Sequence, residues 1–323
     1  MRAAFLAAVQ DLVDGAEIGR ISDALQRGDI EAALQAVNID PAAFDVVGEV
    51  FREGFVAGGV AAAATITGVK APDGSALVFR FGVRAPRAER FLAEESSRLI
   101  TRLTEATFEA VRASLVTGMQ QGRNPRSVAL DLVGRKETQA GRRRGGIIGL
   151  TARQEAYVAA ARAELISGDP EQMRAYLGRA DTMRDRRFDR TVLKAIREGR
   201  ALDAATVNKI VGRYADNHLR LRGETVARTE ILQAMNMSTR EAYEQAIDTG
   251  AIARQEVKKV WRTASDARVR DPHGAINGTV VGIDERFGNG LLHPHEPGAP
   301  ASEVVNCRCT TEYRIDFLAR LGR

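Results

Sequence analysis

A chain of 323 residues is long enough for one large domain or about two to three smaller ones with an ample core. Hydrophobic residues make up 44% and charged residues 28%, as in ordinary soluble proteins, but aromatic residues are only 5%. A core of Ala, Leu, Val and Ile favours packed helices over a β-sandwich. The net charge of +5 favours polyanions, yet it falls short of a dedicated nucleic-acid-binding protein.

The two cysteines, Cys307 and Cys309, lie one residue apart and give no disulfide framework, so reduced thiols or metal ligands are expected. The apolar run at residues 3–9 is followed at once by Asp11, and no small-residue cleavage site is evident. The Ala/Gly-rich run at residues 55–64 is too short to cross a bilayer. We therefore expect a protein that is made and kept in a cytoplasm.

Residues 1–86 are predicted to form a helical region with a short hairpin. Residues 1–40 indicate two short helices that are separated at Gly28-Asp29. Asp40-Pro41 then marks a helix start, with Asp as N-cap and Pro at the first helical position. Residues 77–83 alternate apolar and polar side chains, which predicts a strand, paired with residues 66–70 across a turn.

Residues 87–222 are predicted to form a helical domain. Its clearest helix covers residues 88–122, where apolar residues recur at helical spacing up to Gly122-Arg123-Asn124-Pro125. Capping residues then predict further helix starts. They open a helix after Pro125, a helix with a capping box at Thr151 and Gln154, a helix at Asp169-Pro170, a helix over 181–198, and a helix from Asp203. The sequence thus predicts a mainly α fold with an elongated multi-helix body.

Two basic segments in this region are candidate DNA-facing surfaces. In residues 179–200 basic residues outnumber acidic ones, and the loop at residues 142–144 holds three consecutive arginines. The alternative is a solvated helix with ion pairs at i,i+4 spacing, which the near absence of stacking aromatic residues favours. The candidate phosphate contacts are Arg142, Arg143, Arg144, Arg186, Arg187 and Arg190.

Residues 223–323 are predicted to form a small, turn-rich α+β module at the C-terminus. A helix over 224–247 ends at Asp248-Thr249-Gly250. Residues 257–261 predict a strand, and a turn-rich stretch with many Gly and Pro residues follows. Residues 310–317 predict a last strand that pairs with the first.

This module contains the only tryptophan, both cysteines and three of the four histidines of the chain. Its possible soft ligands are His273, His293, His295, Cys307 and Cys309. Zinc commonly takes four Cys and His ligands, and a turn-rich segment with little core gains most from such a clamp. The sequence therefore allows one structural zinc at His273, His293, Cys307 and Cys309. Alternatively, the cysteines pack as small hydrophobic residues and His273 bonds to a backbone group.

The same module is rich in residues that form ion pairs. Arginine binds carboxylates through two points and can hold a loop against a helix. We therefore expect a structural network in this module. Its members are Arg228, Glu230, Trp261, Asp266, Arg268 and Arg270, together with Glu303. A catalytic alternative makes Glu230 or Asp266 a base beside His273, but no known catalytic motif accompanies them. No catalytic residue is predicted.

The order of these pieces resembles the Mu F-like family of phage head morphogenesis proteins, which are minor head or minor capsid proteins. The similarity covers residues 224–313. Its elements are Ala227-Arg228-Thr229-Glu230 with Asn236, Trp261-Arg262-Thr263, residues 266–270 with His273, Asn277-Gly278, and Asn306-Cys307-Arg308-Cys309. The sequence departs from the family where a histidine is expected closer to the two cysteines, because Glu303-Val304-Val305 stands there.

The resemblance implies a low-copy component of the bacteriophage virion, located inside the head near the portal after synthesis in the host cytoplasm. Its implied partners are the portal protein, a capsid or scaffold protein and packaged DNA, bound non-specifically, with no membrane. Its implied roles are head assembly, DNA packaging and DNA ejection. The family is generally regarded as non-enzymatic, although its domain also occurs fused to toxin domains.

Two other functions stay open at this point. One is a metal-dependent nuclease or hydrolase using His273, His293 and Asp266, or a toxin-like effector carried by the phage; the missing carboxylate pair counts against the hydrolase. The other is a DNA-binding accessory protein, for which the sequence offers no recognisable DNA-binding motif.

Overall fold

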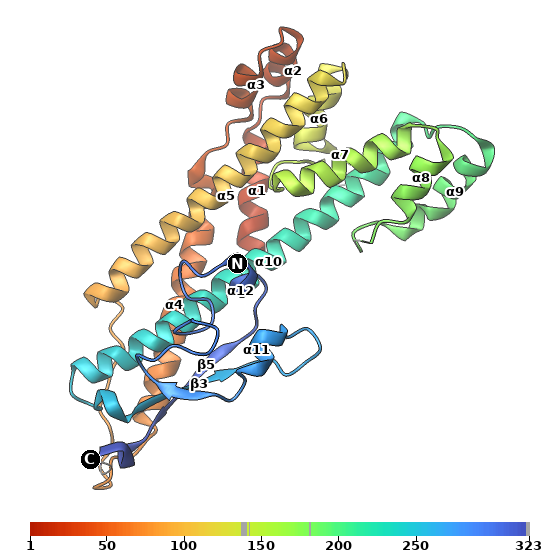
Figure 1. Ribbon diagram of the computed structural model, residues 1–323. Helices are drawn as coiled ribbons and strands as arrows, with labels where there is room; N and C mark the ends of the chain where they lie inside the picture. The colour runs from red at the N-terminus through yellow and green to blue at the C-terminus, as the bar shows by residue number, and fades with distance from the viewer. Residues whose placement is uncertain (137–140, 142, 181, 321–323) are drawn as a thin grey trace. The chain divides into compact units, whose positions relative to one another are not determined.

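The computed structural model describes residues 1–136, 141, 143–180 and 182–320 (Figure 1). The fold is mainly α with a small α+β module, as predicted. Two compact units comprise Met1–Arg2, Val47–Arg98 and Glu224–Arg323 (unit 1) and Ala3–Val46 and Leu99–Gly223 (unit 2). The predicted domains 1–86, 87–222 and 223–323 stay a prediction. Among the described helices, none combines the length and the apolar character that a membrane span requires.

Three helices, not the predicted two, precede residue 40: α1 (Arg2–Gly15), α2 (Ile18–Gln26) and α3 (Ile30–Val37). The predicted break at Gly28-Asp29 is confirmed, since the Asp29 side chain accepts from Ala32 N at 2.9 Å. The additional break arises because Glu17 N donates to Ala36 O of α3 at 3.0 Å, outside its own helix. A tertiary hydrogen bond thus replaces a helical one, which the local pattern does not reveal.

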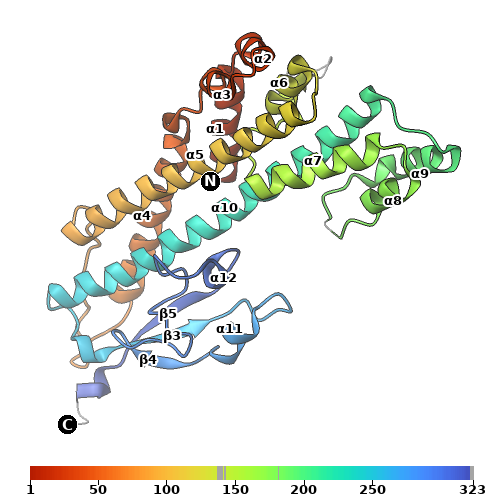
Figure 2. The same ribbon diagram turned by 45° about the horizontal axis from the view of Figure 1, so that its top comes forward.

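The rest of unit 2 follows the predicted start signals closely. Its remaining elements are η1 (Pro41–Phe44), α6 (Pro125–Val133), β1 (Arg135–Lys136), β2 (Arg143–Arg144), α7 (Ala152–Ile166), α8 (Pro170–Leu177), η2 (Arg186–Phe188) and α9 (Asp189–Glu198). The capping box at Thr151 and the start at Asp169-Pro170 are confirmed. The helix predicted over 181–198 begins only at Asp189, and residue 181 lies outside the described residues. Helix α2 packs against α3 and α6, and α8 packs against α7 and α9 (Figures 1 and 2).

Two long helices contribute residues to both units: α5 (Pro86–Gln120) and α10 (Ala204–Asp248). Pro86, predicted to close the first region, is the first residue of α5. The prediction of separate helices on either side of Gly223 is wrong, because α10 runs through it. A mid-helix glycine costs only about 1 kcal/mol, which tertiary packing offsets. Next to it, the buried Arg222 donates to Gly149 O at 2.7 Å.

Unit 1 contains α4 (Asp45–Thr67) from Val47 onwards and a three-stranded antiparallel sheet in the order β4-β3-β5 (Figure 2). The strands are β3 (Val257–Arg262), β4 (Val280–Gly282) and β5 (Thr310–Ile315). The predicted pairing of first and last strands is confirmed. Short helical turns flank the sheet: η3 (Arg254–Glu256), α11 (Asp271–Ala275), α12 (Ala301–Val304) and η4 (Phe317–Arg320). The helix end predicted at 248–250 is also confirmed, with Gly250 at φ +73°.

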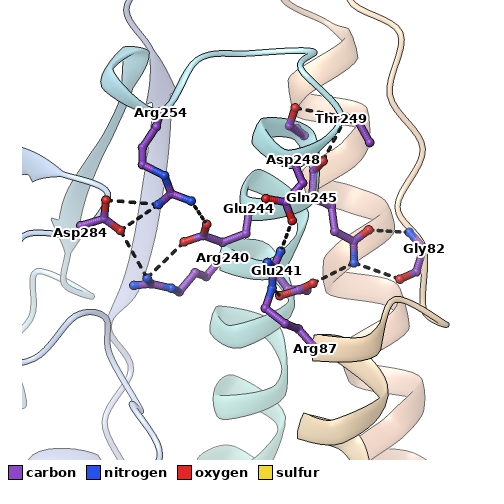
Figure 3. A network of polar contacts seen from close by, with 11 residues as sticks. Gly82, Arg87, Arg240, Glu241, Glu244, Gln245, Asp248, Thr249, Arg254 and Asp284 are labelled. Atoms are coloured by element: carbon purple, nitrogen blue, oxygen red, sulfur yellow. Dashed lines mark hydrogen bonds and ion pairs between the residues drawn. The ribbon is translucent and has the colours of Figure 1, made fainter.

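The strand predicted over residues 77–83 is wrong, because only an isolated bridge joins Lys70 to Ala76. The alternation of faces nevertheless persists, since Val78 is 89% exposed and Phe81 is 7% exposed. At Gly82 the side-chain amide of Gln245 takes the place of a neighbouring strand (Figure 3). It accepts from Gly82 N at 2.8 Å and donates to Gly82 O at 3.0 Å.

Figure 3 shows the polar network around the last turns of α10. On one face Arg87, from the start of α5, donates to Glu241 at 3.0 Å and to Asp248 at 2.8 Å. On the other face Arg254 donates to Glu244 at 2.6 Å and to Asp284, after β4, at 2.9 Å. The end of α10 is therefore tied to the start of α5 and to the sheet module within unit 1.

Candidate metal centre

The sheet of unit 1 carries a small apolar core at one end. Trp261 of β3 is fully buried and meets the Phe287 ring edge to face, with centroids 5.1 Å apart. Cys307 and Cys309 belong to the same buried cluster, immediately before β5. The strand pairing thus brings the Cys-x-Cys pair beside the tryptophan.

Helix α11 brings a histidine to the same place. It begins at Asp271 with Pro272 at an N-terminal position, and His273 lies in its short turn, 1% exposed. His273 Nδ1 lies 3.6 Å from Cys307 Sγ and 3.5 Å from Cys309 Sγ. The three ligand atoms all lie within 4.8 Å of one another. Three of the four predicted ligands are therefore brought together.

A carboxylate orients this histidine from its other side. His273 Nε2 lies 2.8 Å from Glu303 Oε2, and Asn289 Nδ2 donates to the same oxygen at 3.2 Å. A proton on Nε2 leaves the Nδ1 lone pair directed to the sulfurs. Metal-binding histidines usually have such a partner, which fixes the tautomer and raises ligand basicity.

The two thiols share their ionisation. Hydrogen bonding from the Cys309 side chain and the nearby His295 lower the pKa of the Cys307 thiol. The same hydrogen bond, burial and the Cys307 charge raise the pKa of the Cys309 thiol. One thiolate is thus easily formed, whereas the second requires a positive charge beside it. A divalent metal ion would supply that charge.

The part of α10 that belongs to unit 1 starts at Glu224, and its first residues bind the turn that precedes the cysteines. Asn306 has φ +57°, and its backbone N–H donates to Thr229 Oγ1 at 3.2 Å. Arg228 donates to Asn306 Oδ1 at 3.1 Å. Arg228 and Thr229 therefore contact the cysteine turn through Asn306, rather than through a carboxylate.

Asn236, further along α10, holds the backbone on the other side of the cysteines. Its buried amide accepts from Thr311 N at 3.1 Å and donates to Cys309 O at 3.4 Å. It thereby satisfies the free edge at the start of β5. A buried strand edge without such a partner would leave two backbone groups unsatisfied.

The other two histidines of the module lie outside this three-residue group. His293, the fourth predicted ligand, is buried with Nδ1 2.9 Å from Pro294 O, and burial lowers its pKa to about 4. His295 Nε2 lies 3.1 Å from Cys307 O, and its Nδ1 is buried with no hydrogen-bond partner among the described residues. Of the two, His295 is thus closer to the cysteines and retains a spare nitrogen.

The predicted ion-pair network takes a different form. Asp266 pairs with Arg308, one contact being 2.6 Å, whereas Arg270 donates to Val305 O. The hydrogen bonds from Arg308 lower the pKa of the exposed Asp266 to about 2. Such a carboxylate is a weak base, which weakens the hydrolase alternative. Arg308 was not predicted to belong to this network. Its one distinguishing feature in the sequence is its position between the two cysteines.

A buried lysine, also missed in the sequence, holds the turn-rich segment. Lys259 of β3 is fully buried and donates to Ile283 O at 2.9 Å and to Leu292 O at 2.8 Å. Its Nζ lies 5.3 Å from the centroid of the Phe287 ring, and burial lowers its pKa to about 8. The signal in the sequence is the alternation of the strand, which places Lys259 on the same face as Val257 and Trp261.

These observations fit a soft-ligand metal ion. Two thiolates and an imidazole are the ligand types that zinc prefers, and the carboxylate behind the histidine is the usual outer partner. A structural zinc requires a fourth ligand, and the buried His295 Nδ1 has no hydrogen-bond partner among the described residues. The ligand set remains a proposal.

The predicted DNA-facing arginines lie in unit 2, apart from Arg142, which is outside the described residues. Arg143 donates to Gly134 O at 3.0 Å across the β1-β2 pair. Arg186, Arg187 and Arg190 are exposed. Several basic residues of the segment pair with acids, as the alternative predicted. Lys194 pairs with Glu198 at the i,i+4 spacing, whereas other pairs have different spacings: Arg187 with Asp185, Arg184 with Asp189 and Arg179 with Glu164.

Comparison with known families bears on the segment that holds this centre. Residues 186–312 match the family described as phage Mu protein F like protein. This segment is similar to the phage Mu F-like family, and the match covers less than half of the chain. The match begins at Arg186, earlier than the predicted start at residue 224, and it includes His273, Cys307 and Cys309.

Two curated proteins are similar to part of this chain. A protein named NAD(+)–arginine ADP-ribosyltransferase EFV from Enterococcus faecalis is 36% identical over 97 residues, which is 29% of this chain and 19% of that protein. The uncharacterized protein YqbB of Bacillus subtilis is 32% identical over 104 residues, 30% of this chain and 32% of that protein. The similarity thus covers a third or less of each relative. No solved structure matches the chain.

Proposed function

We propose that this chain is a phage minor head protein that acts in head assembly. The observation that carries the proposal is the Mu F-like match over residues 186–312. That segment includes all of α10, the β4-β3-β5 sheet apart from the last residues of β5, and the candidate metal centre. The family resemblance supplies the link to phage head morphogenesis.

The metal centre has a structural role in this proposal. His273, Cys307 and Cys309 hold one zinc ion, with Glu303 orienting the histidine. The bound ion supplies a positive charge that keeps both thiols ionised and links α11 to the start of β5. The apolar core at this end of the sheet is small, and Trp261 and Phe287 form much of it. A metal ion that links α11 to the start of β5 therefore adds stability that so small a core does not supply. The proposed role is not enzymatic.

The proposed partners are other components of the head. The protein binds the portal and contacts capsid or scaffold protein, and the exposed arginines of η2 and α9 face packaged DNA. Arg186, Arg187 and Arg190 provide the charge for non-specific phosphate contacts. In this proposal the protein lies inside the head near the portal, where it acts in packaging or ejection of DNA.

Quantitative mass spectrometry of purified particles from the source tests this proposal. The protein is expected in full heads at a copy number comparable to that of the portal protein. Its loss from emptied heads would indicate ejection with DNA. Its absence from particles would contradict a virion role, and an assay on plasmid DNA with wild-type protein and His273→Ala would then test the nuclease alternative.

A further inference from the structure

Unit 2 has a partly open cavity of about 330 Å³ that the proposed head function does not use. Residues from α5, the loop before α6, α6, α7 and α10 form its walls. Part of the wall is apolar, formed by Val158, Ala159, Ile166 and Val211. Another part is polar or charged and includes Ser114, Arg123, Asp131, Glu155 and Arg162. The cavity therefore suits a ligand with one charged end and one apolar part.

Several arginines converge on one carboxylate in the charged part of the wall. The Asp131 carboxylate, 6% exposed, accepts from Arg135 at 2.5 Å, from Arg162 at 2.8 Å and also from Arg123. One carboxylate thus faces three guanidinium groups. Arg162 also donates to Asn208 at 2.7 Å, and burial lowers its pKa to about 10. A further anion that enters the cavity reduces the electrostatic repulsion among these guanidinium groups.

Glu155 does not fully supply that anion. It lies in the same cavity, is 5% exposed and hydrogen-bonds with Ser114. Burial raises the pKa of Glu155 to about 7, so that much of it is uncharged at neutral pH. An uncharged carboxylic acid can donate a hydrogen bond to an anion, which an ionised one cannot.

We propose that this cavity binds a carboxylate group carried on a short aliphatic chain. The carboxylate lies against the guanidinium groups of Arg123 and Arg162, because guanidinium recognises carboxylate through two parallel hydrogen bonds. The aliphatic part lies along Val158 and Ile166. Two sources share this chemistry: a free small carboxylic acid, and a glutamate side chain of a partner protein.

Isothermal titration of the full-length protein with butyrate, which has one carboxylate and one aliphatic end, tests the site. Ala159→Leu fills the cavity and leaves every charge in place, so we expect its affinity to fall at least tenfold. The matched control is Ala160→Leu, an exposed position on the same helix that does not line the cavity. Circular dichroism establishes that both variants fold. Equal butyrate affinity in the two variants, or no binding by wild-type protein, would overturn the proposal.

The pH dependence distinguishes this cavity from a basic surface. The charged groups that line the cavity with Glu155 are Arg123, Asp131 and Arg162. Butyrate affinity should fall by up to about tenfold between pH 6 and pH 8, as Glu155 ionises. The Glu155→Gln variant should bind with little change over that range. A wild-type affinity that does not change with pH would contradict the role of Glu155 and hence the site.

A competition experiment separates the two sources of the carboxylate. An alanine-rich peptide with one central glutamate is added to the butyrate complex, and the same peptide with glutamine is the control. Displacement by the glutamate peptide alone identifies a partner side chain as the ligand type. Butyrate binding with no displacement identifies a free carboxylic acid.

Discussion

At the residue scale, the turn around Cys307 and Cys309 shows how a few polar groups fix a site. Thr229 accepts from Asn306 N, Asn236 pairs with the backbone at Cys309 and Thr311, and Glu303 orients His273. These groups come from separate parts of the chain, since Thr229 and Asn236 lie on α10 and Glu303 lies on α12. The sequence identified the ligand types, but it could not distinguish His273 from His293, because that difference depends on how the loops after β3 and β4 fold back.

Removing a ligand or its outer partner should reduce zinc binding by different amounts. Cys309→Ser removes a thiolate and should abolish stoichiometric binding. Glu303→Gln leaves all ligands but weakens the orientation of His273, so affinity should fall by about 10- to 100-fold. Competition with a chromophoric chelator measures both. Glu53→Gln, an exposed carboxylate on α4, is the control.

Wild-type protein should also unfold at a lower temperature after chelation, because the metal binds only the folded module. Purified protein that contains no zinc and is unaffected by chelators would contradict the metal centre.

The Glu155 carboxyl should make the stability of unit 2 depend on pH. Its pKa rises from 4.5 to about 7 on folding because the group is buried. The folded state therefore holds a proton that the unfolded state releases between pH 4.5 and 7, so the contribution is complete below pH 4.5 and is lost as pH rises through 7. The shift corresponds to about 3 kcal/mol at most.

Urea unfolding at pH 5 and pH 8 measures this effect. Wild-type protein should lose stability relative to Glu155→Gln as the pH rises. Parallel pH profiles for the two proteins would show that Glu155 is not the group responsible.

At the scale of elements, the local capping signals predicted where helices begin better than whether a long helix continues. Side-chain caps at Asp29, Asp40, Thr151 and Asp169 all lie where the sequence indicated. By contrast, Gly223 lies within α10, because the cost of one glycine is small beside the packing of a long helix. The alternating segment 77–83 presents the expected faces without a strand ladder, since a glutamine side chain serves as its partner at Gly82.

Gln245→Ala should therefore loosen the segment before α5. The substitution removes one acceptor and one donor for Gly82 and leaves its partly buried backbone unsatisfied, at a cost of about 1–3 kcal/mol. Hydrogen–deuterium exchange should increase at residues 77–85 and remain unchanged at β3. Gln120→Ala, at the exposed end of α5, is the control. Unchanged exchange at residues 77–85 would show that packing of Phe81 alone holds the segment.

At the scale of the whole molecule, each compact unit combines segments that lie far apart in the sequence. Unit 1 combines residues 47–98 with residues from 224 onwards, and unit 2 includes the N-terminal helices with residues 99–223. Contacts between segments far apart in the chain define these units. Composition and turn signals mark only local changes along the sequence, so they cannot reveal such a division.

Charge at this scale gives a test of the proposed DNA contacts. Arg186, Arg187 and Arg190 are exposed in unit 2, and they should release counterions when they bind phosphates. The affinity of the protein for duplex DNA should therefore fall steeply with salt. Replacing these three arginines by glutamine should weaken binding and reduce the slope of log affinity against log salt by up to about 3.

The matched control for this test removes the same charge from unit 1. Arg52, Arg84 and Arg90 are exposed there, and their replacement by glutamine lowers the net charge equally. If η2 and α9 form the DNA-facing surface, the control variant keeps nearly the wild-type affinity and salt slope in fluorescence anisotropy titrations. If both triple variants lose affinity to the same extent, binding reflects only the overall charge, and the arginines of η2 and α9 have no special role.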